Sequence, residues 1–120
     1  MRVCVSGSRE FKALHKIQEV LSKLPKDTVI VHGGARGVDW EADTVARKLG
    51  LAVEVHPADW DKHGKSAGHI RNREMVQTCD KVIAFWDGQS KGTAGAIRCS
   101  SDLGKPCEII REEAFGERMP

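Results

Sequence analysis

Short apolar segments recur along the chain at intervals of roughly 25 residues, and stretches with helical periodicity separate them. Each of the apolar segments has the length of a strand. The predicted strands are residues 2–6, 28–32, 51–56, 81–86 and 106–110. A regular alternation of strand and helix is typical of a parallel sheet with right-handed crossover connections.

The gaps between the predicted strands carry apolar residues spaced three and four apart, as on one face of a helix. The expected helices are residues 11–24, 39–49, 66–79 and 93–104. Pro25 ends the first of them, and Gly50 stands just after the second, where glycine is favoured. Asp39, Ser66 and Thr93 are polar residues at predicted helix starts, so we expect their side chains to cap these helices.

The texture of the strands predicts their order in the sheet. The first, second and fourth are nearly continuous apolar runs, which suits strands covered by helices on both faces. The third alternates apolar and polar residues, and the fifth begins with Pro106 and carries Glu108, as edge strands tolerate. The expected fold is α/β, a Rossmann-like three-layer sandwich with a five-stranded parallel sheet of order 3-2-1-4-5. It occupies residues 1–110, and residues 111–120 form a C-terminal tail.

The length of 120 residues suits one domain with a core of its own. The net charge is only +2, and the 19 basic residues are spread along the chain, which argues against duplex nucleic acid as a partner. No apolar run is long enough to cross a membrane, and the first residues do not resemble a signal peptide. The sequence therefore predicts a cytoplasmic protein that does not associate with membranes.

Three loops that leave the carboxyl ends of predicted strands combine glycine with hydroxyl or basic residues, and each leads into a helix. In an open parallel sheet such loops meet at one edge, where glycine permits close approach and helix-start amides favour an anion. Ordinary strand-to-helix turns are also rich in glycine, so a purely structural role is the alternative. None of the loops matches a Walker A loop or GxGxxG. The candidate ligand- or phosphate-binding residues are Ser6, Gly7, Ser8, Arg9, Gly33, Gly34, Arg36, Ser90, Gly92 and Thr93.

Arg71 is a candidate phosphate clamp in the third predicted helix. It lies four residues before Met75 and shares a helix face with it, so its stem sits above an apolar contact. A guanidinium held near a helix start at the carboxyl edge suits a phosphate, and a surface arginine with a packed stem is the alternative. Trp60 and Trp86 are candidates for stacking on a base, although tryptophans at strand ends also serve as core or interface residues.

Two histidines raise the question of a metal. His32 and His56 end neighbouring predicted strands and could approach each other. A metal site needs a third ligand, and none can be identified in the sequence. We therefore expect neither a metal nor a cofactor.

Several motifs in a fixed order resemble one known family. They are VSGSREF, VHGGARGVDWEAD, HPADWDKHGKSAG, IRNREMV, DKVIAFWDGQSKGT and GKPCEII. On these stretches, residues 1–110 resemble the YspA/YpsA-related branch of the SLOG superfamily, which has the SMF/DprA–LOG fold. The resemblance implies a binder of a small nucleotide-type ligand. Because LOG relatives are commonly dimers, it also allows a homodimer.

The LOG phosphoribohydrolases of this superfamily release a base from a nucleoside 5′-monophosphate, and their site resembles an Arg-Lys-x-x-Met helix followed by a PGGxGTxxE loop. Arg71 and Met75 fit the helix pattern, although Asn72 stands where the lysine would be. Gly92–Thr93 fits the part of the loop that receives phosphate, but Ala96 replaces the glutamate. The resemblance therefore implies a site that keeps its phosphate half and lacks its acid.

Glycosidic cleavage needs a carboxylate to steady the ribose or to activate water. Asp39, Glu41 and Asp87 could replace the missing glutamate, although helix capping also explains Asp39 and turn formation also explains Asp87. We therefore favour a binding or sensor module for a nucleoside monophosphate, ADP-ribose or an NAD-related molecule. A nucleotide N-glycosidase, with Arg71 and one of these carboxylates as catalytic residues, is the alternative. A DprA-like binder of single-stranded DNA is the least favoured, because the chain lacks a basic stripe.

Overall fold

Five parallel strands form a single sheet in a computed structural model of the chain, which describes residues 1–111. The strands are β1 (Arg2–Gly7), β2 (Val29–His32), β3 (Ala52–Val55), β4 (Lys81–Trp86) and β5 (Cys107–Arg111). Their order is β3-β2-β1-β4-β5, which confirms the expected fold class and the placement of the third and fifth strands at the edges. The pattern of apolar and polar residues along each strand thus predicts whether helices cover one or both of its faces.

The last strand runs one residue past the expected end of the domain. Arg111 pairs with Trp86 of β4, so the segment expected as a tail, 111–120, begins inside β5. Residues 112–120 lie outside the described part of the chain.

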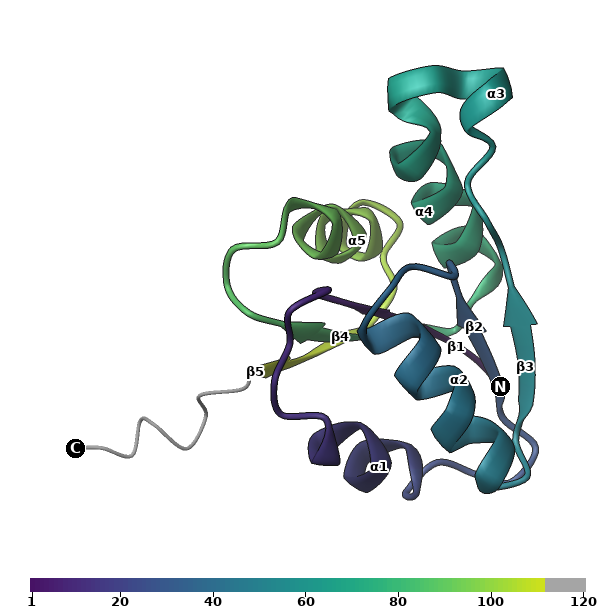
Figure 1. Cartoon of the computed structure of the whole chain (residues 1–120). Helices are drawn as coiled ribbons and strands as arrows, with labels where there is room; N and C mark the ends of the chain where they lie inside the picture. The colour runs from purple at the N-terminus through teal and green to yellow at the C-terminus, as the bar shows by residue number, and fades with distance from the viewer. Residues whose placement is uncertain (112–120) are drawn as a thin grey trace.

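Helices cover both faces of the sheet (Figure 1). They are α1 (His15–Leu21), α2 (Val38–Lys48), α3 (Trp60–His63), the 3-10 helix η1 (Gly64–Ser66), α4 (Ala67–Thr78) and α5 (Lys91–Asp102). Helices α1 and α2 pack on one face, and α4 and α5 pack against each other on the opposite face. The segment from α3 to the start of α4 projects beyond the sheet and is called the arm below (Figure 1).

Two apolar cores lie between the sheet and its helices. On β1, Val3 and Val5 pack with the buried residues of α1 and α2, whereas Cys4 packs with those of α4 and α5. All three side chains are fully buried, as the alternation of side chains along a strand requires when both faces are covered. Burial of this kind anchors the carboxyl ends of β1 and β4 beside the starts of the helices.

The first helix is shorter than the apolar spacing predicts. It begins at His15, and Phe11, which the spacing assigns to it, lies in the preceding loop. Phe11 is nevertheless buried, and its ring meets that of Phe85 edge-on at a centroid distance of 5.8 Å. The apolar character of Phe11 therefore predicts its burial correctly, but the spacing is wrong in placing it in the helix.

All three predicted helix caps are wrong. Ser66 is the residue before α4, but its side chain makes no capping hydrogen bond. Gly37, with φ of +87°, is the residue before α2, so Asp39 lies inside the helix and does not cap it. A side chain at residue 37 would also bring its Cβ within 2.7 Å of the Arg9 carbonyl oxygen, which explains the glycine. At α5 the cap is Ser90, whose side chain accepts from the Thr93 N–H, so Thr93 lies in the first turn.

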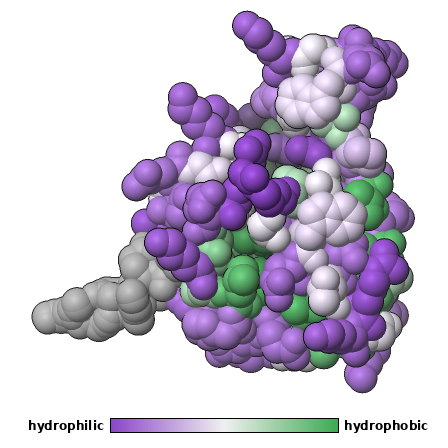
Figure 2. Space-filling model, in the orientation of Figure 1, coloured by the Kyte–Doolittle hydropathy of each residue, from purple (hydrophilic) through white to green (hydrophobic). Residues whose placement is uncertain are grey.

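The surface in the view of Figure 1 is mainly hydrophilic, with hydrophobic residues exposed mostly in the lower half of the molecule (Figure 2). Within residues 1–111, no helix combines the length and the apolar character that a membrane crossing requires.

Candidate functional site

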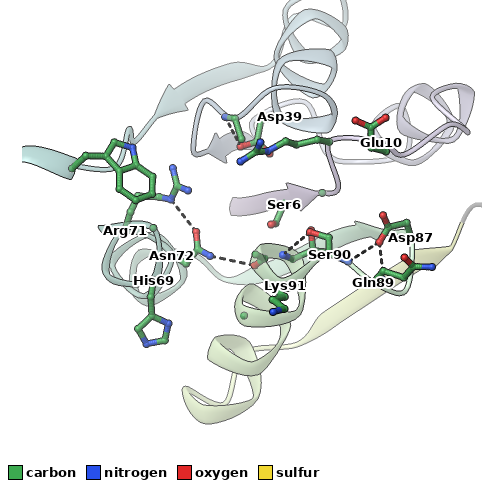
Figure 3. A pocket seen from close by; sticks show the side chains of 18 residues that line it. Ser6, Glu10, Asp39, His69, Arg71, Asn72, Asp87, Gln89, Ser90 and Lys91 are labelled. Atoms are coloured by element: carbon green, nitrogen blue, oxygen red, sulfur yellow. Dashed lines mark hydrogen bonds between the residues drawn. The ribbon is translucent and has the colours of Figure 1, made fainter. Parts of the chain in front are cut away.

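A cavity of about 680 Å³ opens at the carboxyl edge of the sheet, between the ends of β1 and β4 and the starts of α2, α4 and α5. This is the edge at which ligands bind in open α/β sheets. Many of the side chains around it are polar (Figure 3). The predicted site residues that line it are Ser6, Gly7, Arg9, Asp39, Arg71, Asp87, Ser90, Gly92 and Thr93.

The other predicted site residues lie outside the cavity wall. Ser8 is buried beneath it, and its hydroxyl accepts a hydrogen bond from the Asp87 N–H at 3.1 Å. Gly33, Gly34, Arg36 and Glu41 belong to the β2–α2 loop and the first turns of α2, and none of them lines the cavity. The second glycine-rich loop therefore contributes to the wall only through Ala35 and Asp39.

The amides of that loop are used inside the protein. One oxygen of Asp39, Oδ2, accepts from the N–H groups of Gly33 at 3.1 Å and Ala35 at 3.0 Å. The Gly34 N–H donates to Nδ1 of His32 at 3.0 Å. Burial raises the pKa of the Asp39 carboxyl, against the lowering effect of these bonds and of nearby positive charge. The loop is therefore a scaffold that Asp39 holds in shape.

His32 is part of a buried polar chain. Because its Nδ1 accepts from Gly34, its Nε2 carries the proton and donates to Asp43 at 2.7 Å. Burial opposes the charge of Asp43, but hydrogen bonds from Arg47, at 2.6 Å, and from His32 outweigh it and lower the pKa of the carboxyl. His56 pairs with Glu54 instead, and residues 1–111 contain no group of three side chains that could hold a metal ion.

Arg71 cross-links the ends of two strands to α4. Its Nη1 donates to the carbonyl oxygens of Gly33, at 2.7 Å, and His56, at 3.3 Å, and its Nε donates to Asn72 at 2.9 Å. The guanidinium occupies the space that a side chain at Gly33 would need. Asn72 continues the link to α5, because its Nδ2 lies 3.4 Å from the Gly92 carbonyl oxygen. Arg71 therefore lines the cavity and also positions the backbone around it.

Asp87 organises the turn that leads into α5. Its Oδ1 accepts from the N–H groups of Gln89 and Ser90, each at 2.8 Å, as predicted for a turn-forming aspartate. These two bonds lower the pKa of the carboxyl. One oxygen of Asp87 is thus already committed to the protein, although the residue lines the cavity.

The first turn of α5 presents almost bare backbone to the cavity. Gly92 and Gly95 both line it, and a Cβ added at either position would meet no atom within 4 Å. The first amides of a helix have no partner within the helix. Ser90 takes that of Thr93, and no described residue takes those of Lys91 and Gly92. Lys91 adds an exposed ammonium at the same place.

Several lining residues were missed in the sequence. Gln89 and Lys91 stand in the glycine-rich loop after β4, so their position in that loop was the available signal. Ala35 stands in the glycine-rich loop after β2, and Asn72 stands at the position of the LOG lysine, so the sequence held a signal for both. Glu10, Gly68, His69 and Gly95 gave no local signal.

The two tryptophans proposed for stacking differ in position. Trp60, on the arm, lines the cavity and is 61% exposed. Trp86 does not line it, because its Nε1 donates to the Ser90 carbonyl at 3.0 Å and its ring lies 5.5 Å from the Arg111 guanidinium carbon. Only Trp60 is therefore placed to meet a ligand.

Two solved structures of DNA processing protein A (DprA) share the fold. The Streptococcus pneumoniae protein matches with a TM-score of 0.77 at 20% identity, over 90% of this chain and 49% of that one. The Helicobacter pylori protein matches with a TM-score of 0.62 at 20% identity, over 91% of this chain and 64% of that one. The chain thus spans about half of the first protein and less than two thirds of the second.

The Helicobacter pylori structure is described as revealing a single-stranded DNA binding mode. This finding corrects the expectation that nucleic acid is a disfavoured partner. That expectation rested on a net charge of +2 without a basic stripe, a criterion suited to duplex DNA. Single strands can also be held by stacking on aromatic side chains, so overall charge does not exclude them.

Sequence comparison agrees with the motifs. The model of the "YspA, cpYpsA-related SLOG family" matches residues 1–63. The Gene 61 protein of Mycobacterium phage D29 is 42% identical over 115 residues, which cover 88% of this chain and 92% of that protein. The chain therefore belongs to the YspA, cpYpsA-related SLOG family.

Proposed function

We propose that the chain binds a phosphate-bearing, nucleotide-derived ligand, such as a nucleoside monophosphate, ADP-ribose or an NAD-related molecule, in the cavity at the carboxyl edge. The observation that carries the proposal is the bare first turn of α5, which lines the cavity with Gly92 and Gly95. Because these two residues have no side chain, a ligand can contact the backbone of this helix start directly.

The start of α5 has the chemistry of an anion site. The amides of Lys91 and Gly92 are without a partner among the described residues, and the helix dipole favours negative charge here. The Lys91 ammonium adds a full positive charge, and Ser90 lies beside it (Figure 3). Together these groups suit a phosphate that reaches the cavity floor near Ser6.

The two glycines also have a cost that access to a ligand would explain. Glycine in a helix interior, as at Gly95, is less stable than alanine by about 1 kcal/mol, and neither Gly92 nor Gly95 is crowded enough to exclude a methyl group. Packing therefore gives no reason for these glycines. Contact with a bound molecule does.

The size and rim of the cavity suit a molecule of nucleotide dimensions. Small-molecule sites range over roughly 300–1,000 Å³, and this cavity holds about 680 Å³. Trp60 supplies an exposed aromatic face at the rim, on which a base could stack.

Single-stranded DNA is the second candidate ligand. The likeness to the Helicobacter pylori DprA, described by its single-stranded DNA binding mode, favours it. The exposed Trp60 and the exposed Lys91, which line the same cavity, favour it as well. Stacking on aromatic rings and contacts of basic side chains with phosphates are the usual means of holding such strands.

Turnover by a nucleotide N-glycosidase has weaker support. The position of the LOG glutamate is occupied by Ala96, which has no acidic group and is fully buried. Of the candidate carboxylates, Glu41 lies outside the cavity, and Asp39 and Asp87 each hold two backbone amides. The raised pKa of Asp39 would suit a general acid, so released base is measured in the test below.

The test combines titration calorimetry with chromatography of the products. Nucleoside 5′-monophosphates, ADP-ribose, NAD and a short single-stranded oligonucleotide are titrated into the protein, and free base is assayed after incubation. We expect a mononucleotide-type ligand to bind without release of base. Lys91→Ala should weaken binding roughly tenfold through the loss of a charged contact. Lys48→Ala, an exposed change at the end of α2 outside the cavity, is the matched control.

The outcomes separate the candidates. Binding of the oligonucleotide alone, with strong dependence on salt, would replace the small ligand by a DNA strand. Free base that appears with wild-type protein would establish the glycosidase. The absence of any binding, or equal effects of the two lysine variants, would refute the assignment of the site.

A further inference from the structure

The two sides of the cavity differ in chemistry. Ser90 and Lys91, at the start of α5, lie on one side, Asp39 lies on the other, and Ser6 stands between them (Figure 3). The side at α5 suits an anion, as argued above. A phosphate would be repelled by the carboxylate of Asp39, so the opposite side requires a different part of the ligand.

Asp39 has one oxygen that the protein uses and one that it does not. The N–H groups of Gly33 and Ala35 both donate to Oδ2, at 3.1 and 3.0 Å. No hydrogen bond reaches Oδ1 from residues 1–111, and no ion pair in that part of the chain includes Asp39. The residue is only 5% exposed, yet it lines the cavity.

A carboxylate oxygen in this state calls for a donor. Oδ1 still reaches the cavity, because Thr28 Oγ1 is the only buried side-chain polar atom of residues 1–111 that lacks a hydrogen-bond partner. A hydroxyl of a bound ligand could therefore take the place of water at Oδ1. The two amide bonds hold the carboxylate in a fixed orientation, so the donor must come from the contents of the cavity. The ligand that places its phosphate at α5 would bring a neutral donor to this point.

We propose that Oδ1 of Asp39 accepts a hydrogen bond from the 2′- or 3′-hydroxyl of the ligand's ribose, so that the site recognises the sugar as well as the phosphate. A sugar hydroxyl is the neutral donor that lies a few bonds from the 5′-phosphate in every ribonucleotide. The inference rests on the proposed function and adds the class of sugar to it.

The variant Asp39→Asn isolates the free oxygen. Its amide carbonyl can accept both loop bonds in place of Oδ2, which turns its NH2 group toward the position of Oδ1. A donor then replaces the acceptor at almost unchanged shape. Asp102→Asn, at the exposed far end of α5, makes the same change of charge away from the cavity and serves as control.

The experiment compares sugars on an otherwise identical ligand. The four ribonucleoside 5′-monophosphates and their 2′-deoxy and 3′-deoxy counterparts are titrated calorimetrically into wild-type protein and both variants. We expect one of the deoxy forms to bind wild type roughly 10- to 100-fold more weakly than the ribo form, the effect of losing a hydrogen bond to a charged group. Asp39→Asn should lose most of this preference, because its neutral amide can only donate to the hydroxyl oxygen and so replaces a charge-assisted bond by a weaker one. Asp102→Asn should keep the wild-type preference.

The wild-type comparison needs no variant, so it decides the matter even if Asp39→Asn fails to fold. Equal affinities of ribo, 2′-deoxy and 3′-deoxy forms for wild type would overturn the inference and leave the phosphate site intact. A preference for ribose that keeps its full size in folded Asp39→Asn would overturn it as well. If no monophosphate of any sugar binds, the proposed function itself fails.

Discussion

Gly95→Ala is expected to stabilise the protein and to impair its ligand binding at the same time. Gly95 lies inside α5 with a negative φ, and a Cβ there would meet no atom within 4 Å. Alanine therefore gains its helical preference without a steric penalty, which amounts to about 1 kcal/mol. For a domain of this size the gain raises Tm by about 3–6 °C. The new methyl group stands on the cavity wall, where a ligand would otherwise touch the backbone.

The assay pairs thermal unfolding with titration of the best-binding nucleotide. Displacement of the ligand by the width of a methyl group should weaken binding roughly tenfold, since the amides of Lys91 and Gly92 would lose contact with the phosphate. Ser101→Ala, an exposed change at the other end of α5, should add about 0.5 kcal/mol of stability without changing affinity. Unchanged binding by a stabilised Gly95→Ala protein would refute the close approach of the ligand to α5.

Three further predictions concern the residues that shape the cavity. Arg71→Ala leaves the carbonyl oxygens of Gly33 and His56 without their donor. Urea unfolding should therefore show a free energy of unfolding lower by about 1–3 kcal/mol, and an unchanged value would contradict the cross-link. Ser8→Ala removes the acceptor of the Asp87 N–H and should cost about 1 kcal/mol, with a wild-type unfolding midpoint as the contrary result. Burial raises the pKa of Asp39 in the folded state, so ionisation of Asp39 destabilises the folded protein. This destabilisation is absent below the usual aspartate pKa, and it is complete once the pH has risen above the pKa of the folded state. The stability of Asp39→Asn relative to wild type should therefore be greater at pH 7 than at pH 3, and an equal difference at both pH values would rule this out.

The sheet could be predicted because its signals are local. An unbroken apolar run such as β4 needs cover on both faces, and the polar alternation of the third strand needs solvent on one, so their order follows from composition alone. Helix starts were harder. Thr93 and Ser90 are both acceptable caps, and the choice between them depends on the turn that Asp87 forms just before the helix.

The roles of the glycines could not be read from the sequence, because they depend on contacts between distant residues. Gly33 makes room for Arg71, which lies 38 residues further along the chain. Gly7 makes room for Val38 of α2 in the same way. A glycine-rich loop therefore predicts close approach without saying whether a ligand or another part of the protein approaches.

Net charge was a poor guide to partners, because it does not tell where single charges stand in the cavity wall. The net charge of +2 is a sum over the whole chain and hides the charges of both signs in the cavity wall. These are Arg9, Arg71 and Lys91, and Glu10, Asp39 and Asp87. Among the acids, Asp87 directs one oxygen to backbone amides beside α5, while Asp39 faces the helix start from across the cavity. A ligand with one negative end and one hydroxyl-bearing end fits that asymmetry, whereas a uniformly anionic ligand would meet repulsion at Asp39. The position of the acids, and not the sum of the charges, therefore favours a nucleotide over an unsubstituted phosphate.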